Sequence, residues 1–239
     1  MAGSNELSGQ TALITGGSRG IGLAIAKRLG ELGGRIVLCA RNVEVLAVAV
    51  AGLQKDGIEA VGFPADIGRA DQVAALVEKA HKALGEIDIL VNNAGIGLSR
   101  QLHEVGEEEW DRVMDTNLKG VFLVSKAVAP EMIRRRKGYI ANICSLAGKN
   151  SFAGGSVYCA SKWGLLGLNN CLAEELRGYG IRVSAICPGS VASGFSPHAG
   201  KEEKKMLQPE DVAHAVAMLV TAAPQNFISE VLMRPTQKP

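Results

Sequence analysis

The sequence predicts a doubly wound α/β fold, in which a mostly parallel sheet is covered by helices on both faces. Short runs rich in β-branched residues alternate with longer segments whose apolar residues recur at i, i+3, i+4 and i+7. A glycine-rich turn follows the first run, and no Pro- or Ser-rich linker divides the chain. Strict alternation of this kind is typical of βαβ units, so we expect one domain over residues 1–239.

The expected elements follow one another in strict order. Strands are predicted at residues 11–15, 35–40, 60–64, 87–92, 138–144, 181–187 and 228–233, which makes a seven-stranded sheet. Helices are predicted at residues 21–32, 43–55, 70–84, 107–136, 157–179 and 209–221. Residues 190–207 are rich in Gly, Ser and charge. Because ligands of open α/β sheets bind at the carboxyl ends of the strands, we expect this loop to cover the substrate.

Composition narrows the class of protein. Of 239 residues, 47% are hydrophobic and only 4% aromatic, which predicts an aliphatic core. A net charge of +2, with no basic stripe among aromatics, argues against a nucleic-acid partner. The polar N-terminus and the lack of any run of 18 apolar residues favour a cytoplasmic protein without a membrane partner.

Cysteine and histidine show no metal-binding pattern. The five cysteines lack a C-x-x-C spacing, and the four histidines lack ligand spacing, so we expect a reducing compartment and no metal. The one dense basic run is at residues 134–137. Cations at the end of a helix complement its dipole, and docking of an acidic partner is the alternative.

Residues 15–22 read Thr-Gly-Gly-Ser-Arg-Gly-Ile-Gly and join the first strand to the first helix. Glycines there allow a tight turn, so that amides at the helix N-terminus can face a pyrophosphate. Sites that prefer NAD usually place a carboxylate at the end of the second strand. Here that position holds Arg41, and Arg19 projects from the loop. Two guanidiniums suit a 2′-phosphate, so the expected cofactor is NADP(H).

Tyr158 and Lys162 are four residues apart in a predicted helix, and Ser145 lies thirteen residues before the tyrosine. The i, i+4 spacing puts the phenol and the ammonium on one face. A lysine there favours the ionised phenol. An unperturbed phenol has a pKa of about 10, which makes it a poor base at neutral pH. The pair is interpreted as a tuned proton donor and acceptor; a solvated helix face is the alternative.

These motifs together resemble the short-chain dehydrogenase/reductase family over about residues 10–188. The matching positions occur in the family's order, and they are the glycine loop, Asp66, residues 92–95 (Asn-Asn-Ala-Gly), Asn117, Ser145, Tyr158 with Lys162, and residues 188–189 (Pro-Gly). The resemblance implies a single-domain Rossmann-type fold and a soluble oxidoreductase that acts on CH–OH or carbonyl groups with NAD(P).

The resemblance also implies roles for four catalytic residues, Asn117, Ser145, Tyr158 and Lys162. Tyr158 would protonate the carbonyl oxygen during reduction, and Ser145 would hydrogen-bond the same oxygen. Lys162 would bind the nicotinamide ribose and lower the pKa of the tyrosine. Asn117 would fix a water between the lysine and solvent. A simple strand-end or helix cap is the alternative for the serine and the asparagine.

The implied cofactor site is larger. Asp66 and Ile67 would lie against the adenine, Asn93 would support the sheet and the ribose, Ile21 would line the pyrophosphate turn, and Ser193 replaces the family's usual threonine at the carboxamide. The full predicted set is Gly16, Ser18, Arg19, Gly20, Ile21, Gly22, Arg41, Asp66, Ile67, Asn93, Ala94, Gly95, Tyr158, Lys162, Pro188, Gly189, Val191 and Ser193.

The substrate is less defined than the chemistry. The nearest branch is 3-oxoacyl-[acyl-carrier-protein] reductase, so an acyl thioester and an acyl carrier protein are candidates. That branch docks its carrier with basic residues near the crevice; Arg136 matches one, but Tyr179 occupies the other position. A small ketone, sugar or steroid-like alcohol is the alternative substrate, and a non-catalytic NADP-binding regulator is a remote one. The long helices 107–136 and 157–179 resemble those that pair between subunits, so a homodimer or homotetramer is expected.

Overall fold

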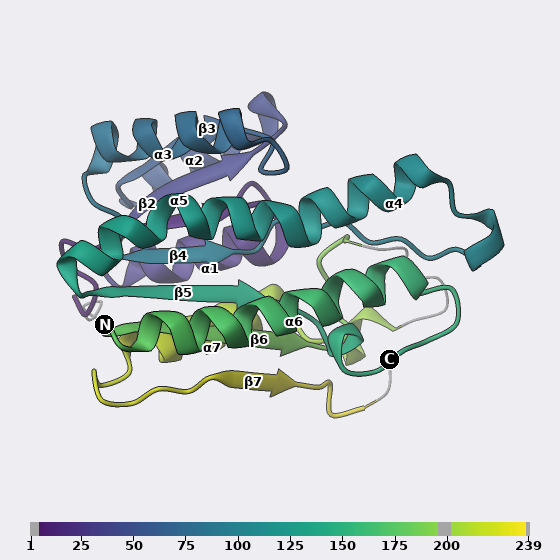
Figure 1. The fold of residues 1–239 in the computed structure, drawn as a ribbon. Helices are drawn as coiled ribbons and strands as arrows, with labels where there is room; N and C mark the ends of the chain where they lie inside the picture. Colours follow the sequence, from purple (N-terminus) through teal and green to yellow (C-terminus); the bar gives the residue numbers. More distant parts are fainter. Residues whose placement is uncertain (1–4, 196–201, 238–239) are drawn as a thin grey trace.

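The structure, a computed structural model, describes residues 5–195 and 202–237. Its centre is one seven-stranded sheet with the order β3-β2-β1-β4-β5-β6-β7, in which every neighbouring pair is parallel (Figure 1). The strands are β1 (Thr11–Thr15), β2 (Arg35–Ala40), β3 (Ala60–Pro64), β4 (Ile89–Asn92), β5 (Gly138–Ile143), β6 (Ile181–Pro188) and β7 (Glu230–Met233). The predicted fold class is therefore confirmed.

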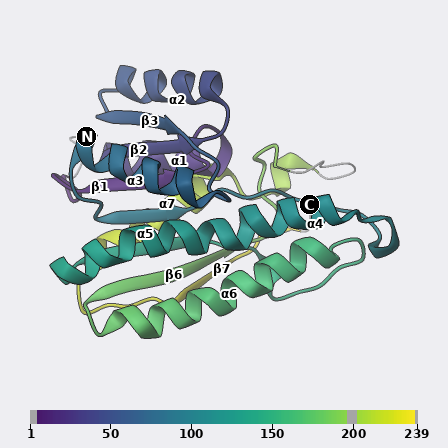
Figure 2. The same ribbon diagram turned by 45° about the horizontal axis from the view of Figure 1, so that its top comes forward.

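Helices cover both faces of the sheet (Figures 1 and 2). They are α1 (Gly20–Glu31), α2 (Val43–Lys55), α3 (Ala70–Leu84), α4 (Glu107–Met114), α5 (Gly120–Arg135), α6 (Ser156–Arg177) and α7 (Pro209–Thr221). Apolar residues of α1, α2 and α7 form one core with the sheet, whereas those of α3, α5 and α6 form cores on the other face. Because both faces are covered, the central strands are continuous apolar runs.

The strand order places a topological switch between β1 and β4. The chain leaves β1 through α1 toward β2 on one side, and returns through α3 to β4 on the other. Loops that depart in opposite directions leave a crevice at the carboxyl ends of these two strands. In Figure 1 the carboxyl ends of the labelled strands point to the right.

The single helix predicted over residues 107–136 is interrupted. A π-helical turn, Asp115–Lys119, separates α4 from α5. Such turns occur frequently at functional sites because they redirect one side chain without ending the helix. Here the buried side chain of Asn117, within the turn, is directed to groups outside the helix.

Two strands begin later than predicted, and both differences have a local cause. The amide of Ile87 donates to the carboxylate of Glu131 instead of a neighbouring strand, so β4 starts at Ile89. Similarly, the carbonyl of Ile228 accepts from the hydroxyl of Ser184, and β7 starts at Glu230. The other element ends agree with the prediction within one or two residues.

The ends of the predicted covering segment 190–207 are joined. Val191 forms a parallel bridge with Leu207, and the amide of Ala192 donates to the Leu207 carbonyl at 2.9 Å. Residues 196–201 lie outside the described residues. The described residues at the two ends of the segment therefore lie next to each other, just after β6.

The basic residues at the end of α5 form specific ion pairs and hydrogen bonds, in addition to complementing the helix dipole. Arg135 is only 17% exposed and pairs with Asp88 at 2.8 Å and with Glu131 at 3.4 Å. Arg136 adopts a left-handed conformation with φ 53°, and its guanidinium donates to the Gly178 carbonyl.

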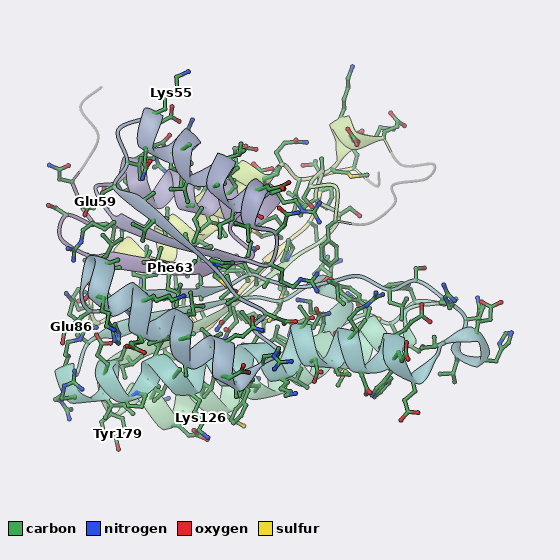
Figure 3. The ribbon with its side chains drawn as sticks, turned by 90° about the horizontal axis from the view of Figure 1, so that it is seen from above. Lys55, Glu59, Phe63, Glu86, Lys126 and Tyr179 are labelled. Atoms are coloured by element: carbon green, nitrogen blue, oxygen red, sulfur yellow. The ribbon has the colours of Figure 1, made fainter. Side chains whose placement is uncertain are left out.

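This charged cluster lies at the amino ends of the strands. Arg136 comes just before β5, whereas Ser145 comes just after it, so the two lie at opposite ends of the sheet. Figure 3 labels Glu86 and Tyr179 at this amino end, on the left. The prediction that Arg136 lies near the crevice is therefore wrong for a single chain. The length of β5, about 20 Å, separates Arg136 from the crevice.

The described residues contain neither a membrane-spanning helix nor a cluster of metal ligands. In residues 5–195 and 202–237, no helix is both long and apolar enough to span a membrane. The same part of the chain holds no group of three or more His, Cys, Asp or Glu side chains arranged for a metal ion.

Candidate functional site

The glycine loop adopts a shape that side chains would obstruct. Gly16 and Gly20 have φ values of +64° and +53°, which favour glycine. A Cβ on Gly22 would lie 2.4 Å from the carbonyl oxygen of Gly16, so only glycine lets the first turn of α1 approach the loop this closely. The result is a tight backbone cradle at the N-terminus of α1, which is a suitable place for an anion.

Asn93 holds this cradle to β4. Its side-chain amide donates to the carbonyls of Thr15 and Gly16, both at 3.0 Å. In return, the hydroxyl oxygen of Thr15 accepts from the amides of Asn93 and Ala94, both at 3.1 Å. The ends of β1 and β4 are thereby linked through Asn93, and its predicted contact with the ribose stays a prediction.

Two cations line the crevice from different segments, Arg41 directly after β2 and Arg19 in the glycine loop. Arg19 and Arg41 are both exposed and line the crevice, and within the described residues neither forms an ion pair with a carboxylate. Asp66 also lines the crevice, but its carboxylate accepts from the amide of Gly68 at 2.9 Å. Burial raises the pKa of the neighbouring Cys39 thiol to about 12, so this cysteine stays neutral. The local charge is therefore positive on the side of Arg19 and Arg41.

Ser145, Tyr158 and Lys162 all line the same crevice. Ser145 is the second residue after β5, and its hydroxyl oxygen accepts from the amide of Ala147 at 3.1 Å. Tyr158 is half-buried in the first turn of α6, and Lys162 follows one turn later, where it is 4% exposed. The lysine Nζ lies 6.0 Å from the centroid of the tyrosine ring and donates to the Ile143 carbonyl at 3.0 Å.

Asn117 occupies a different position from the other three. It is fully buried and does not line the crevice. Its amide nitrogen donates to the Ile96 carbonyl (2.9 Å) and to the Ser161 hydroxyl (3.0 Å), and its oxygen accepts from the Ile96 amide (2.8 Å). Asn117 therefore fastens the segment after β4 to the helix that carries Tyr158 and Lys162.

The crevice has a volume of about 1540 Å³. It brings together every predicted site residue except Gly22, which lies beneath the loop, and Asn117. The predicted residues that line it are Gly16, Ser18, Arg19, Gly20, Ile21, Arg41, Asp66, Ile67, Asn93, Ala94, Gly95, Ser145, Tyr158, Lys162, Pro188, Gly189, Val191 and Ser193.

Some lining residues were not predicted from the sequence. The ring of Phe195 lies 6.1 Å from that of Tyr158, between centroids, and its edge is the nearest neighbour of Gly97. Residues 234–237 also line the crevice, and Pro235 contacts Gly189. These contacts join segments far apart in the chain, so no local sequence signal could have indicated them.

Comparison with known proteins identifies the family of this chain. The family model for short chain dehydrogenases matches residues 10–204. The 3-oxoacyl-[acyl-carrier-protein] reductase FabG of Staphylococcus aureus (strain Mu50) is 36% identical over 223 residues, which cover 89% of this chain and 91% of the relative.

Two solved structures are similar over nearly the whole chain. A metagenomic short-chain oxidoreductase in complex with NADP is 46% identical, with a TM-score of 0.87, and the match covers 98% of this chain and 100% of that chain. A variant of actinorhodin polyketide ketoreductase with NADPH is 33% identical, with a TM-score of 0.88, and covers 97% and 98%. From the motifs, the crevice and these matches, this chain belongs to the short-chain dehydrogenase family of oxidoreductases.

Proposed function

We propose that the protein is an NADPH-dependent oxidoreductase that reduces a carbonyl group to a secondary alcohol. The observation that carries the proposal is the convergence of Ser145, Tyr158 and Lys162 on one crevice with the glycine loop. A protein that only bound a dinucleotide would need the loop but not these three side chains in the same place.

The residues around the crevice fit NADP(H). The cradle between Gly16 and Gly22 leaves no room for side chains, which suits the close approach of a pyrophosphate. Arg19 and Arg41 offer two guanidiniums without carboxylate partners among the described residues, and these match the 2′-phosphate that distinguishes NADP from NAD. The similar structures that hold NADP and NADPH support the same choice. When bound, the cofactor supplies the hydride.

Side chains of this protein would donate the proton to the substrate oxygen. The bond from the Ala147 amide uses a lone pair of the Ser145 oxygen, so the hydroxyl proton remains for the substrate carbonyl oxygen. Tyr158 would donate its phenolic proton to that oxygen as reduction proceeds. An ammonium 6.0 Å from its ring stabilises the negative charge that the tyrosine then carries. Lys162 would therefore support the tyrosine and keep its remaining donors for the ribose.

Phe195 would restrict water on the substrate side. Its ring is tilted by 51° against that of Tyr158, and its edge closes over Gly97. An apolar wall beside the phenol lowers the local dielectric and strengthens the interactions of the proton-transfer groups.

An acyl thioester is the first substrate class to test, because FabG is 36% identical over most of the chain. A small ketone, sugar or steroid-like alcohol is the second. The position of Arg136 at the other end of the sheet argues against its docking a carrier protein at the crevice of its own chain.

The protein is also proposed to assemble as a homodimer or homotetramer through α5 and α6. Their outward surfaces carry Phe122 and Trp163, which are 45% and 52% exposed. Lys126, labelled in Figure 3, lies 5.7 Å from the ring of Phe122 on this outer surface. Sedimentation equilibrium tests this assembly; a monomer at micromolar concentration would contradict it.

A kinetic screen tests the proposed reaction. NADPH oxidation would be followed with acetoacetyl thioesters, diketones and sugars, with NADH as the matched cofactor control. We expect turnover with at least one carbonyl and a clear preference for NADPH. Tight NADPH binding without turnover across the panel would instead favour a non-catalytic regulator.

A further inference from the structure

Cys144 and Cys187 lie side by side at the carboxyl ends of β5 and β6. Ile143 pairs with Ile186 in the parallel register, and the Cys144 amide donates to the Ile186 carbonyl at 2.7 Å. A cysteine follows each of these two isoleucines in the chain: Cys144 directly after β5, and Cys187 within β6. In-register residues of parallel strands project to the same face, and both thiols belong to one buried cluster beneath α6.

The spacing of the two residues permits a disulfide. Neighbouring strands lie about 4.8 Å apart, which falls inside the range of about 4.4–6.8 Å between the Cα atoms of a disulfide. The two thiols are close enough to affect each other's protonation. Only the Cβ atoms need to approach, by about 1 Å, to reach the usual disulfide separation.

The environment assigns different roles to the two sulfurs. The neighbouring Cys187 thiol, and then the ammonium of Lys162, lower the pKa of the Cys144 thiol against the effect of burial. The neighbouring Cys144 thiol and burial raise the pKa of Cys187, whose Sγ lies 3.5 Å from the Glu230 carboxylate. That carboxylate pairs with Lys149 at 2.8 Å. The Lys162 ammonium thus favours the thiolate of Cys144, whereas the Glu230 carboxylate disfavours the thiolate of Cys187.

Only one member of the pair faces the crevice. Cys144 is 3% exposed but lines the crevice, whereas Cys187 is fully buried behind it. A small reagent in the crevice therefore meets Cys144 before Cys187. The exposed Cys171 lies elsewhere, on α6.

We propose that Cys144 and Cys187 form a dithiol oxidation site, at which a small peroxide converts the two thiols into an intramolecular disulfide. The Cys144 thiolate attacks one peroxide oxygen, the O–O bond breaks, and the departing oxygen takes up a proton to leave as water or an alcohol. Cys187 then attacks the sulfenic sulfur of Cys144, the S–O bond breaks, and water leaves with the proton of Cys187. The two thiols lose two electrons and two protons, and the peroxide is reduced.

The disulfide would act on the site through the backbone. Ser145 directly follows Cys144, and Pro188 and Gly189 follow Cys187. Drawing the two Cβ atoms together moves both segments, and misplacement by about 1 Å can cost roughly a hundredfold in rate. A molecule bound over the crevice floor would block access to Cys144. The oxidation concerns the two thiols alone and does not rest on the proposed reaction.

Thiol chemistry and mass spectrometry test the site directly on the full-length protein. Hydrogen peroxide is added with and without NADP, thiols are alkylated after denaturation, and peptides are mapped. Matched variants are Cys187→Ser, which removes the resolving thiol, and Cys171→Ala, which removes the exposed thiol. A Cys144→Ser variant provides a second way to break the pair.

In the wild-type protein and in Cys171→Ala we expect one peptide pair linked through Cys144 and Cys187. The linkage should be reversed by dithiothreitol and slowed by NADP. In Cys187→Ser, Cys144 should instead gain oxygen. Two results would overturn the site: both thiols remain alkylatable after other residues oxidise, or a disulfide forms that links a different pair. These readouts stay valid if the protein reduces no carbonyl.

Discussion

At the residue scale, the proposed chemistry depends on the phenolic oxygen of Tyr158. Replacing Tyr158 by Phe removes this one atom and keeps the ring that packs near Phe195. We expect turnover to fall by about 10²–10⁴-fold, because general acid catalysis contributes about that much. NADPH affinity, measured by fluorescence titration, should be unchanged. Tyr179→Phe, at the far end of the sheet, is the control, and a nearly active Tyr158→Phe enzyme would rule out the proposed proton transfer.

The expected preference for NADPH over NADH depends on single residues, of which Arg41 is one. Arg41 is exposed at the end of β2 and lines the crevice. Arg41→Asp should weaken NADPH binding by about 10–100-fold, because a charge-assisted hydrogen bond contributes about 1.5–3 kcal/mol and the new carboxylate repels a phosphate.

NADH binding should change little in the same variant. Isothermal titration with both cofactors measures the difference. Arg177→Asp makes the same charge change at the end of α6, away from the crevice, and serves as the control. Equal losses for NADPH and NADH would refute the contact with the 2′-phosphate.

At the element scale, the junction between β1 and α1 depends on close backbone approach. Gly22→Ala would place a methyl group 2.4 Å from the Gly16 carbonyl and 2.5 Å from the Asn93 amide nitrogen. We expect a loss of about 1–3 kcal/mol in stability, as for other overpacked sites, together with weaker NADPH binding.

A second glycine provides the matched control. Gly52, inside α2, has no atom within 4 Å of an added Cβ. Gly52→Ala should therefore stabilise the protein by about 0.5–1 kcal/mol and leave cofactor binding intact. Urea unfolding and NADPH titration measure both variants. A Gly22→Ala protein as stable as the wild type would contradict the steric argument.

A buried charge network at the end of α5 is expected to stabilise the packing of this helix against its neighbours. Arg135 is 17% exposed, whereas Asp88 and Glu131, which it pairs with, are 9% and 7% exposed. Arg135→Met would remove the closest cation of Asp88 and one of the two basic partners of Glu131, of which His81 remains, at an expected cost of about 3 kcal/mol in the free energy of unfolding.

The neighbouring Arg134 tests this account. It is 69% exposed, and its bond to Glu86 is 3.6 Å long. Arg134→Met should change stability by less than about 0.5 kcal/mol. Similar losses for both variants in urea unfolding would mean that the network contributes no more than surface charge does.

At the scale of the whole molecule, the two ends of the sheet have separate roles. The crevice is at the carboxyl ends, and the cluster with Arg136 is at the amino ends. We therefore expect Arg136→Glu to change KM by the same factor for a carrier-linked substrate and for the matching free thioester. The measurement is a pair of steady-state titrations. A selective rise in KM for the carrier-linked substrate would indicate that a carrier docks at this end of a chain.

Much of this organisation could be predicted locally. Strand and helix positions follow from periodicity over a few residues, and the glycine loop and the Tyr158–Lys162 pair are contiguous patterns. Features that depend on distant partners could not be predicted. The π-helical turn at Asn117 exists because that side chain reaches Ile96 and Ser161, which are 21 and 44 residues away. No pattern within one helix contains that information.

The sequence by itself determined the fold class, the order of the elements and the residues expected at the site. The spacing of apolar residues and the positions of glycines are local features, so they can be recognised in a short segment of the sequence. Only the tertiary structure decided which of these residues meet in the crevice, that Asn117 lies behind it, that Arg136 lies at the other end, and that Cys144 stands beside Cys187. Register between strands sets those positions, and it arises only when the whole sheet assembles.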